Sequence, residues 1–192
     1  RDRYLTEDQA HVLEHQFFNI LRDENIDGIL LAGDVFDRAV PPIEAIELWD
    51  SIITRLAMDY KMPLFVVSGN HDGAERLEVG RSMLGQSGIH IWGSPHHALK
   101  PFEFEGTDGK VVICPMPFSE PRRIGEALFA DVESTNAEST DTEIADIITP
   151  CYEQNCESAL NLHNYDQMYQ AWSDYLYKQV PKGMRSIAIS HA

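Results

Sequence analysis

The sequence predicts an α/β fold, with mixed β-sheets flanked by helices. Apolar, strand-like runs at residues 29–32 and 64–68 are each followed at once by a polar cluster, at residues 33–37 and 69–72. The stretch between them has the length and pattern of a crossover helix, which two parallel neighbouring strands require. Because the carboxyl ends of parallel strands meet at one edge of a sheet, both clusters are expected there, where α/β proteins bind their ligands.

The predicted elements follow one another regularly through the first half of the chain. Thr6 and Gln9 have the spacing of a capping box, and Pro41 and Pro42 are typical of a first helical turn. Apolar residues at helical or strand-like spacing define the rest. The expected elements are helices at about residues 6–25, 41–56 and 75–84, and strands at residues 26–32, 63–68 and 89–92.

The second half of the chain changes character. The Thr-Asp-Gly sequence at residues 107–109 is a strong turn signal, which predicts a hairpin between strands at about 98–105 and 110–114. Residues 132–142 are polar and turn-like. Two further helices and a last strand are expected at residues 143–161, 165–179 and 186–190.

Length and composition indicate one domain. The 192 residues can bury a sizeable core, and 43% hydrophobic and 24% charged residues are ordinary values for a globular protein. No apolar run reaches membrane-spanning length, and the first residues lack the apolar core of a signal peptide. We therefore expect one domain over residues 1–192, with an acidic helical insertion at about 131–182 and no membrane association.

The cysteines bear on the cellular compartment. Cys114, Cys151 and Cys156 are odd in number and lack the spacing of a disulfide framework. This pattern predicts reduced thiols and a cytoplasmic location. Cys151 and Cys156 could form a redox pair, but two incidental thiols are the simpler interpretation.

The net charge of −16 disfavours binding of nucleic acid by bulk electrostatics. The charge is unevenly distributed, because residues 131–174 contain ten acidic residues and no Lys or Arg. The rest of the chain carries 15 basic and 21 acidic residues, a net charge of −6. The acidic segment could be a solvated helical face, or a surface kept away from DNA or offered to a partner. We favour the solvated face.

The polar clusters contain the side chains that a two-metal phosphoesterase site uses. Such a site holds two divalent ions about 3.5–4 Å apart, which activate a water and neutralise phosphate charge. Asp34, at a strand end, is placed to bridge two ions, and Asn70 can offer its amide oxygen to one of them. His191, at the end of the last predicted strand, could supply a nitrogen to the same ion.

The other polar residues of the clusters suit catalysis and substrate binding. His71 is more useful as a proton donor to the leaving oxygen, or as a stabiliser of phosphorane charge, than as a ligand. Asp72 or Asp37 could orient its imidazole, and a supporting role suits Asp37 better than metal ligation. Arg38 could contact a phosphate or simply be solvated, and the sequence favours neither.

Each motif has a simpler structural interpretation when it stands alone. Residues 69–72 could be only a turn with a helix cap, and residues 33–37 are an equally weak signal. Both motifs together, each behind a buried strand and one crossover apart, favour a functional site. The other histidines lack partner spacing and are expected at the surface or in the core: His11, His15, His90, His96, His97 and His163.

These residues resemble the calcineurin-like metallophosphoesterase family. Its pattern comprises Asp-x-His, Gly-Asp-x-x-Asp, Gly-Asn-His-Asp, a later single His, and Gly-His-x-His. Residues 33–37 match the second motif, residues 69–72 the third, and His191 the single histidine. The resemblance runs across essentially the whole chain.

Within the family, the chain most resembles the nuclease subunit of a bacterial DNA repair complex. Three features carry this closer resemblance. They are Pro41-Pro42 after the second motif, the Cys-Pro-Met-Pro-Phe run at residues 114–118 ahead of Pro121-Arg122, and the segment at residues 186–191 that ends the helical insertion.

The resemblance implies a specific fold and activity. The fold would be an incomplete metallophosphoesterase sandwich, and the activity that of a metal-dependent exonuclease and hairpin endonuclease. It would hydrolyse double-stranded DNA ends and hairpins in repair, recombination and replication. Two divalent ions, Mn²⁺ above all, a coiled-coil ATPase partner and a homodimer of the nuclease subunit are also implied. By the family pattern Asp34 bridges the metals, Asn70 and His191 bind one of them, and His71 is the catalytic histidine.

Two motifs of the family pattern are absent from the sequence. These are the Asp-x-His expected before Arg1 and the Gly-His-x-His expected after Ala192. The first motif normally lies on a central strand, so its loss would expose neighbours such as Ile29 and Leu31. We therefore expect the 192 residues to be part of a protein roughly twice as long, and to hold fewer than two metal ions by themselves.

Two other function classes fit the same residues. Another phosphoesterase, acting on a phosphoprotein, a cyclic nucleotide or a phospholipid, would share Asp34 and residues 70–72. A non-catalytic interaction domain would fit the missing motifs, but a binding scaffold has no need of so many clustered polar ligands. The segment at residues 115–123 and the helical insertion favour the nuclease.

Overall fold

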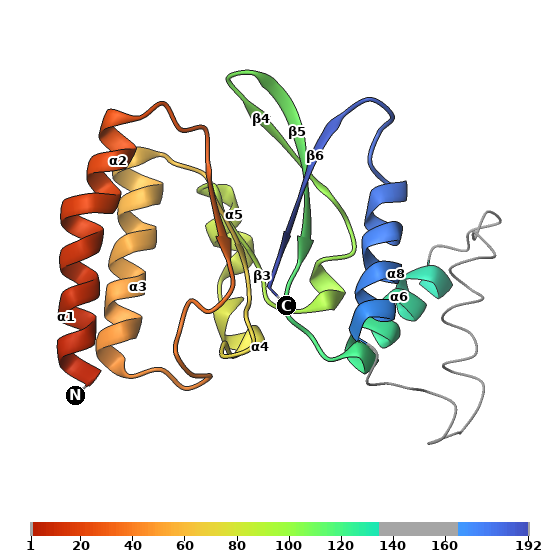
Figure 1. Ribbon diagram of the computed structural model, residues 1–192, viewed down its shortest axis with the longest axis horizontal. Helices are drawn as coiled ribbons and strands as arrows, with labels where there is room; N and C mark the ends of the chain where they lie inside the picture. The colour runs from red at the N-terminus through yellow and green to blue at the C-terminus, as the bar shows by residue number, and fades with distance from the viewer. Residues whose placement is uncertain (1, 135–164, 192) are drawn as a thin grey trace.

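The computed structural model describes residues 2–134 and 165–191, and Figure 1 shows their arrangement. The elements of the amino-terminal half are α1 (Asp2–Val12), η1 (Leu13–Phe17), α2 (Phe18–Asp23), β1 (Ile29–Ala32), α3 (Ile43–Arg55), η2 (Leu56–Tyr60), β2 (Leu64–Val67), α4 (Ala74–Leu77), α5 (Arg81–Gln86) and β3 (Ile89–Trp92). Those of the carboxyl-terminal half are η3 (Pro95–His97), β4 (Phe102–Gly106), β5 (Gly109–Met116), α6 (Pro121–Ser134), α8 (Tyr165–Lys178) and β6 (Arg185–Ser190).

The strands form two three-stranded sheets. The first has the order β1-β2-β3 and is parallel throughout, with Leu64 paired to both Ile29 and Ile89. The second has the order β4-β5-β6, in which β4 and β5 form an antiparallel hairpin and β5 and β6 are parallel. In Figure 1 the long helices α1 and α3 lie outside the first sheet, and α6 and α8 lie outside the second. The expectation of an α/β fold with mixed sheets flanked by helices is thus confirmed.

β2 is the central strand of the first sheet and is buried on both faces. A strand in this position is expected to be apolar without interruption, and its four residues are Leu-Phe-Val-Val. Leu64 and Val66 pack with the helices of the amino-terminal half, whereas Phe65 and Val67 face the second sheet. The alternation of side chains along this one strand therefore joins the two cores of the molecule.

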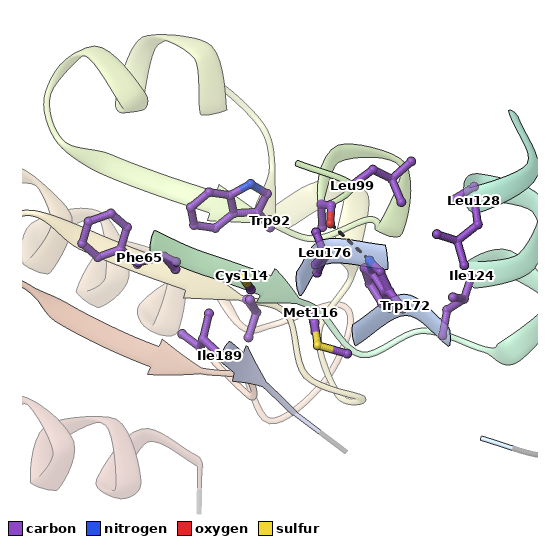
Figure 2. Packing of buried hydrophobic residues seen from close by; sticks show 14 of the residues in the cluster. Phe65, Trp92, Leu99, Cys114, Met116, Ile124, Leu128, Trp172, Leu176 and Ile189 are labelled. Atoms are coloured by element: carbon purple, nitrogen blue, oxygen red, sulfur yellow. Dashed lines mark hydrogen bonds between the residues drawn. The ribbon is translucent and has the colours of Figure 1, made fainter. Parts of the chain in front are cut away.

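The larger core lies between the second sheet, strands β2 and β3 of the first sheet, and helices α6 and α8 (Figure 2). Trp172 at its centre is fully buried, and its indole Nε1–H donates a hydrogen bond to the carbonyl oxygen of Ala98 at 3.2 Å. A buried indole needs such a partner, because an unsatisfied donor in an apolar core is costly. This core anchors α8 to the chain that leads out of η3.

Several sequence-based boundaries differ from the structure. The first helix begins at Asp2, so Thr6 lies inside it and the capping-box prediction is wrong. The helix expected at residues 75–84 is two short helices, separated where Gly80 takes a φ of +76°. Helix α6, over Pro121–Ser134, is not among the elements that the sequence pattern predicts. The helix expected at 143–161 lies outside the described residues.

The two apolar side chains expected to be exposed on β1 are half-buried. Ile29 and Leu31 line an apolar cavity of about 610 Å³ between β1 and the helices that cover it. On the opposite face of the strand Leu30 is exposed. Among the described residues, no helix is long and apolar enough to cross a membrane.

Asp27 joins the two sheets at the end far from the polar clusters. Its Oδ1 accepts hydrogen bonds from the backbone N–H of Thr107, at 2.9 Å, and from the Thr107 hydroxyl, at 2.5 Å. These bonds hold the pKa of Asp27 below its ordinary value of 3.8. Asp27 therefore stabilises the fold fully above that pH, and the contribution is lost as the pH falls through the lowered pKa.

We expect Asp27→Asn to lower the unfolding midpoint at neutral pH, because it removes the charge from these hydrogen bonds. The difference from the wild type should shrink as the pH is lowered below 3.8. Thermal unfolding of both proteins at a series of pH values would test this. A difference that stays constant from neutral to acid pH would contradict it.

Candidate metal centre

The three residues predicted as metal ligands lie together at one edge of the sheets. Asp34 and Asn70 follow the carboxyl ends of the adjacent parallel strands β1 and β2. His191 follows β6 of the second sheet, whose end lies beside that of β1 (Figure 1). His191 Nε2 is 3.0 Å from Asn70 Oδ1 and 3.6 Å from Asp34 Oδ1.

Glycines permit this close approach. Gly33 has a φ of +81°, and a Cβ placed on it would lie 2.3 Å from His191 Nδ1. A Cβ on Gly69 would lie 2.2 Å from Asp34 Oδ1. Asp34 itself has a φ of +50°, which is uncommon for a residue other than glycine and is concentrated at functional sites. Glycine is therefore required before Asp34 and before Asn70 for a steric reason, because a side chain at either position would collide with the residues of the site.

We expect Gly33→Ala to weaken Mn²⁺ binding by about 10- to 100-fold, because the added methyl group must displace His191. Gly80→Ala is the matched control. Gly80 has a similar φ of +76°, but a Cβ there meets no atom of the described residues within 4 Å. Manganese titration of the full-length protein would compare the two variants. Equal affinity in Gly33→Ala and the wild type would contradict the prediction.

Asp72 connects the two polar clusters. Its carboxylate accepts hydrogen bonds from the backbone N–H groups of Val35 at 3.2 Å, Phe36 at 2.9 Å and Gly69 at 2.8 Å. Two of these donors belong to the loop after β1 and the third to the loop after β2. In the structure the carboxylate of Asp72 thus holds backbone amides and makes no described hydrogen bond to the imidazole of His71.

His71 is oriented by a backbone carbonyl. Its Nδ1 lies 2.8 Å from the main-chain oxygen of Asp37, which can only accept, so Nδ1 carries the proton. The other ring nitrogen, Nε2, makes no contact in this hydrogen bond and is the atom that could exchange a proton with a substrate. This hydrogen bond and the negative charge of Asp34 raise the pKa of His71. The Asp37 carboxylate instead pairs with Arg38 at 2.9 Å, and both side chains are exposed.

The set of facing atoms fits a cation. His191 Nδ1 lies 2.9 Å from the carbonyl oxygen of Ala32 and must donate to it, so in the neutral imidazole Nε2 bears a lone pair. That lone pair faces the oxygens of Asn70 and Asp34, and three acceptors that converge repel one another unless a metal ion lies between them or His191 carries a second proton on Nε2. One carboxylate, one amide oxygen and one imidazole suit Mn²⁺ or Zn²⁺. Within residues 2–134 and 165–191, no group of three or more His, Cys, Asp or Glu is arranged to hold a metal ion.

A second set of contacts, which the sequence does not predict, supports the loop after β2. The Ser68 hydroxyl donates to the carbonyl oxygen of Gly93 at 2.8 Å. The buried carboxylate of Glu78 accepts the N–H groups of Gly93 and Ser94 at 2.9 and 3.3 Å, and His97 Nδ1 lies 2.8 Å from its second oxygen. The sequence carried no local signal for this, because Glu78 and its partners are separated by 15 or more residues.

The loop after β1 is fixed in a similar way. The Arg76 guanidinium on α4 donates to the carbonyl oxygen of Ala39 at 2.7 Å. Together with the bond between His71 and the Asp37 carbonyl, this contact ties the loop to the elements after β2. Both loops that carry predicted site residues are therefore held by long-range hydrogen bonds.

Comparisons with known proteins agree with this geometry. The family model for calcineurin-like phosphoesterases matches residues 7–178. The chain is also similar to the SbcD component of the nuclease SbcCD of Bacillus subtilis (strain 168), with 31% identity over 121 residues. That alignment covers 63% of this chain and 31% of the relative, so the chain spans about a third of that protein's length. Members of the family typically bind two metal ions. The chain belongs to the calcineurin-like phosphoesterase family.

Proposed function

We propose that this chain is part of a metal-dependent DNA nuclease that hydrolyses phosphodiester bonds at double-stranded DNA ends and hairpins. The observation that carries the proposal is the convergence of Asp34, Asn70 and His191, with His71 beside them on the same loop as Asn70. The similarity to a protein named as part of a nuclease supports the choice of DNA as substrate.

Each residue has a stated role in the proposal. Asp34 would be the ligand shared by two divalent ions, Mn²⁺ in our proposal, and Asn70 and His191 would hold one of them. When bound, these ions supply an activated water and neutralise the charge of the phosphate. His71 would act as the imidazolium, the form that its raised pKa favours, and would donate its Nε2 proton to the leaving oxygen while its Nδ1–H stays fixed on the Asp37 carbonyl.

The loop after β1 would supply a side chain that contacts the phosphate of the substrate. Arg38 is exposed and lies next to Asp37, so a phosphate could exchange with the Asp37 carboxylate as its partner. An exposed ion pair contributes little to stability and is readily given up. Asp72 contributes by holding the two loops in register, as its three backbone hydrogen bonds suggest.

The proposal extends to partners and location. In the full-length protein we infer a homodimer of nuclease subunits that acts with an SbcC-type coiled-coil ATPase in DNA repair and recombination. The similarity to a component of SbcCD supports this inference. The same similarity and the free, buried thiol of Cys114 support a cytoplasmic location.

The experiment compares two substrates with the full-length protein in the presence of Mn²⁺. One is a linear duplex with a hairpin end, and the other is a small chromogenic phosphodiester. We expect cleavage of the duplex and the hairpin. Hydrolysis confined to the small substrate would favour another phosphoesterase, and tight Mn²⁺ binding without hydrolysis of either would favour a non-catalytic interaction domain.

A further inference from the structure

We propose that Tyr169, on α8, is a positioning residue for the loop that carries Asn70 and His71. It would act by holding residues 117–119 against the start of that loop. This inference rests on the proposed function only in its activity readout, because the contacts that carry it are independent of the substrate.

The Tyr169 hydroxyl bridges two backbone groups. Its oxygen accepts the N–H of Ser119 at 3.1 Å, and its proton is donated to the carbonyl oxygen of Pro117 at 3.3 Å. Phe118 lies between these two residues, and its own N–H donates to the carbonyl oxygen of Ser68 at 2.9 Å. Ser68 directly precedes Gly69, so two successive contacts lead from Tyr169 to the loop after β2.

The position of the hydroxyl is fixed from the helix side. The Tyr169 ring stacks on Tyr165 at 6.4 Å between centroids and packs against Trp172 at 5.9 Å. Trp172 is fully buried and hydrogen-bonded to Ala98. Burial also raises the pKa of Tyr169, so the hydroxyl keeps the proton it donates to Pro117. The bridge is therefore anchored in the larger core.

A second contact between the same parts of the molecule is weaker. Arg123 on α6 pairs with Glu75 on α4 at 2.6 Å, and α4 begins two residues after Asp72. Both side chains are substantially exposed, and such pairs typically contribute about 0–1 kcal/mol. Ser119, in contrast, is buried, so the loss of the Tyr169 hydroxyl would leave its N–H without that acceptor. We therefore expect the hydrogen bonds of Tyr169, more than the Arg123–Glu75 ion pair, to hold the loop after β2 in place.

The chain offers a matched control. Tyr175 lies on the same helix, and its half-buried hydroxyl donates to the carboxylate of Asp131 on α6. Tyr175→Phe therefore removes a comparable contact of α8 without touching residues 117–119. A purely structural role for Tyr169 predicts that the two tyrosine variants behave alike.

The test compares Tyr169→Phe, Tyr175→Phe and the wild type as full-length proteins, at a temperature where all three are folded. We expect Tyr169→Phe to lower kcat about tenfold with an unchanged KM, because the loop is displaced from its reactive geometry. Tyr175→Phe should keep the wild-type kcat. Equal kcat in Tyr169→Phe and the wild type, or an equal fall in both variants, would overturn the proposal.

Hydrogen exchange separates this inference from the proposed function. Amides of residues 69–72 should exchange faster in Tyr169→Phe than in Tyr175→Phe, whatever the substrate is. If the wild type cleaves no duplex, the proposed function fails and the exchange rates still decide the role of Tyr169. Equal exchange at residues 69–72 in the two variants would reject it.

Discussion

Replacing His71 with alanine in the full-length protein is expected to lower phosphodiester hydrolysis by about 10²- to 10⁴-fold while Mn²⁺ binding is retained. The imidazole is held by the Asp37 carbonyl. It does not belong to the proposed ligand set of Asp34, Asn70 and His191. The side chain is exposed, so its removal should change stability little. The variant therefore separates proton donation from metal binding.

Two measurements decide this prediction. Rates of duplex cleavage give the loss of activity, and titration with MnCl₂ gives the metal affinity. His96→Ala is the control, because it removes another exposed histidine, on η3. Cleavage at the wild-type rate in His71→Ala would exclude the role of proton donor. A parallel loss of Mn²⁺ affinity would instead make His71 a ligand.

Replacing Asp72 with alanine is expected to lower both the stability of the protein and its affinity for Mn²⁺. Three backbone N–H groups in the two loops would lose a charged acceptor, and each such hydrogen bond is worth about 1.5–3 kcal/mol. We expect a loss of at least about 3 kcal/mol in the free energy of unfolding. Because the loops carry Asp34 and Asn70, Mn²⁺ affinity should fall as well.

Asp72→Asn is the graded control for this prediction. It keeps the size of the side chain and one acceptor oxygen, but turns an NH₂ group toward backbone donors. We expect its stability and Mn²⁺ affinity to lie between those of the wild type and Asp72→Ala. Denaturant unfolding and metal titration measure both quantities. Wild-type stability in Asp72→Ala would show that the three hydrogen bonds do not hold the loops together.

The proximity of Asp34 and Asn70 was predictable from the sequence because it depends on the order of strands β1 and β2 alone. Parallel neighbours end at the same edge, and the apolar runs before Gly33 and Gly69 identified those neighbours. For His191 the sequence predicted only a place at the end of a strand, and its proximity to the other two residues depends on the packing of the second sheet against the first. These inferences use only the periodicity of side chains and the chemistry of the residues that come next.

The supporting contacts were not predictable, because they join residues far apart in the sequence. Glu78 and His97 pair across 19 positions, and nothing near either residue marks the other as its partner. A local signal also failed at the start of the chain. Thr6 has a capping-box neighbour, yet the helix extends past it to Asp2. The acceptor for His71 was sought among carboxylates, whereas a backbone carbonyl has no sequence signature at all.

The ligand candidates come from both sheets, and this has a thermodynamic consequence. Asp34 and Asn70 are attached to strands of the first sheet, whereas His191 is attached to a strand of the second. An ion held by all three would bind only when the sheets are in register, so ion binding and sheet docking would favour each other by the same factor. A partner that shifts one sheet against the other would therefore change the affinity for the ion without contacting any of the three ligand residues.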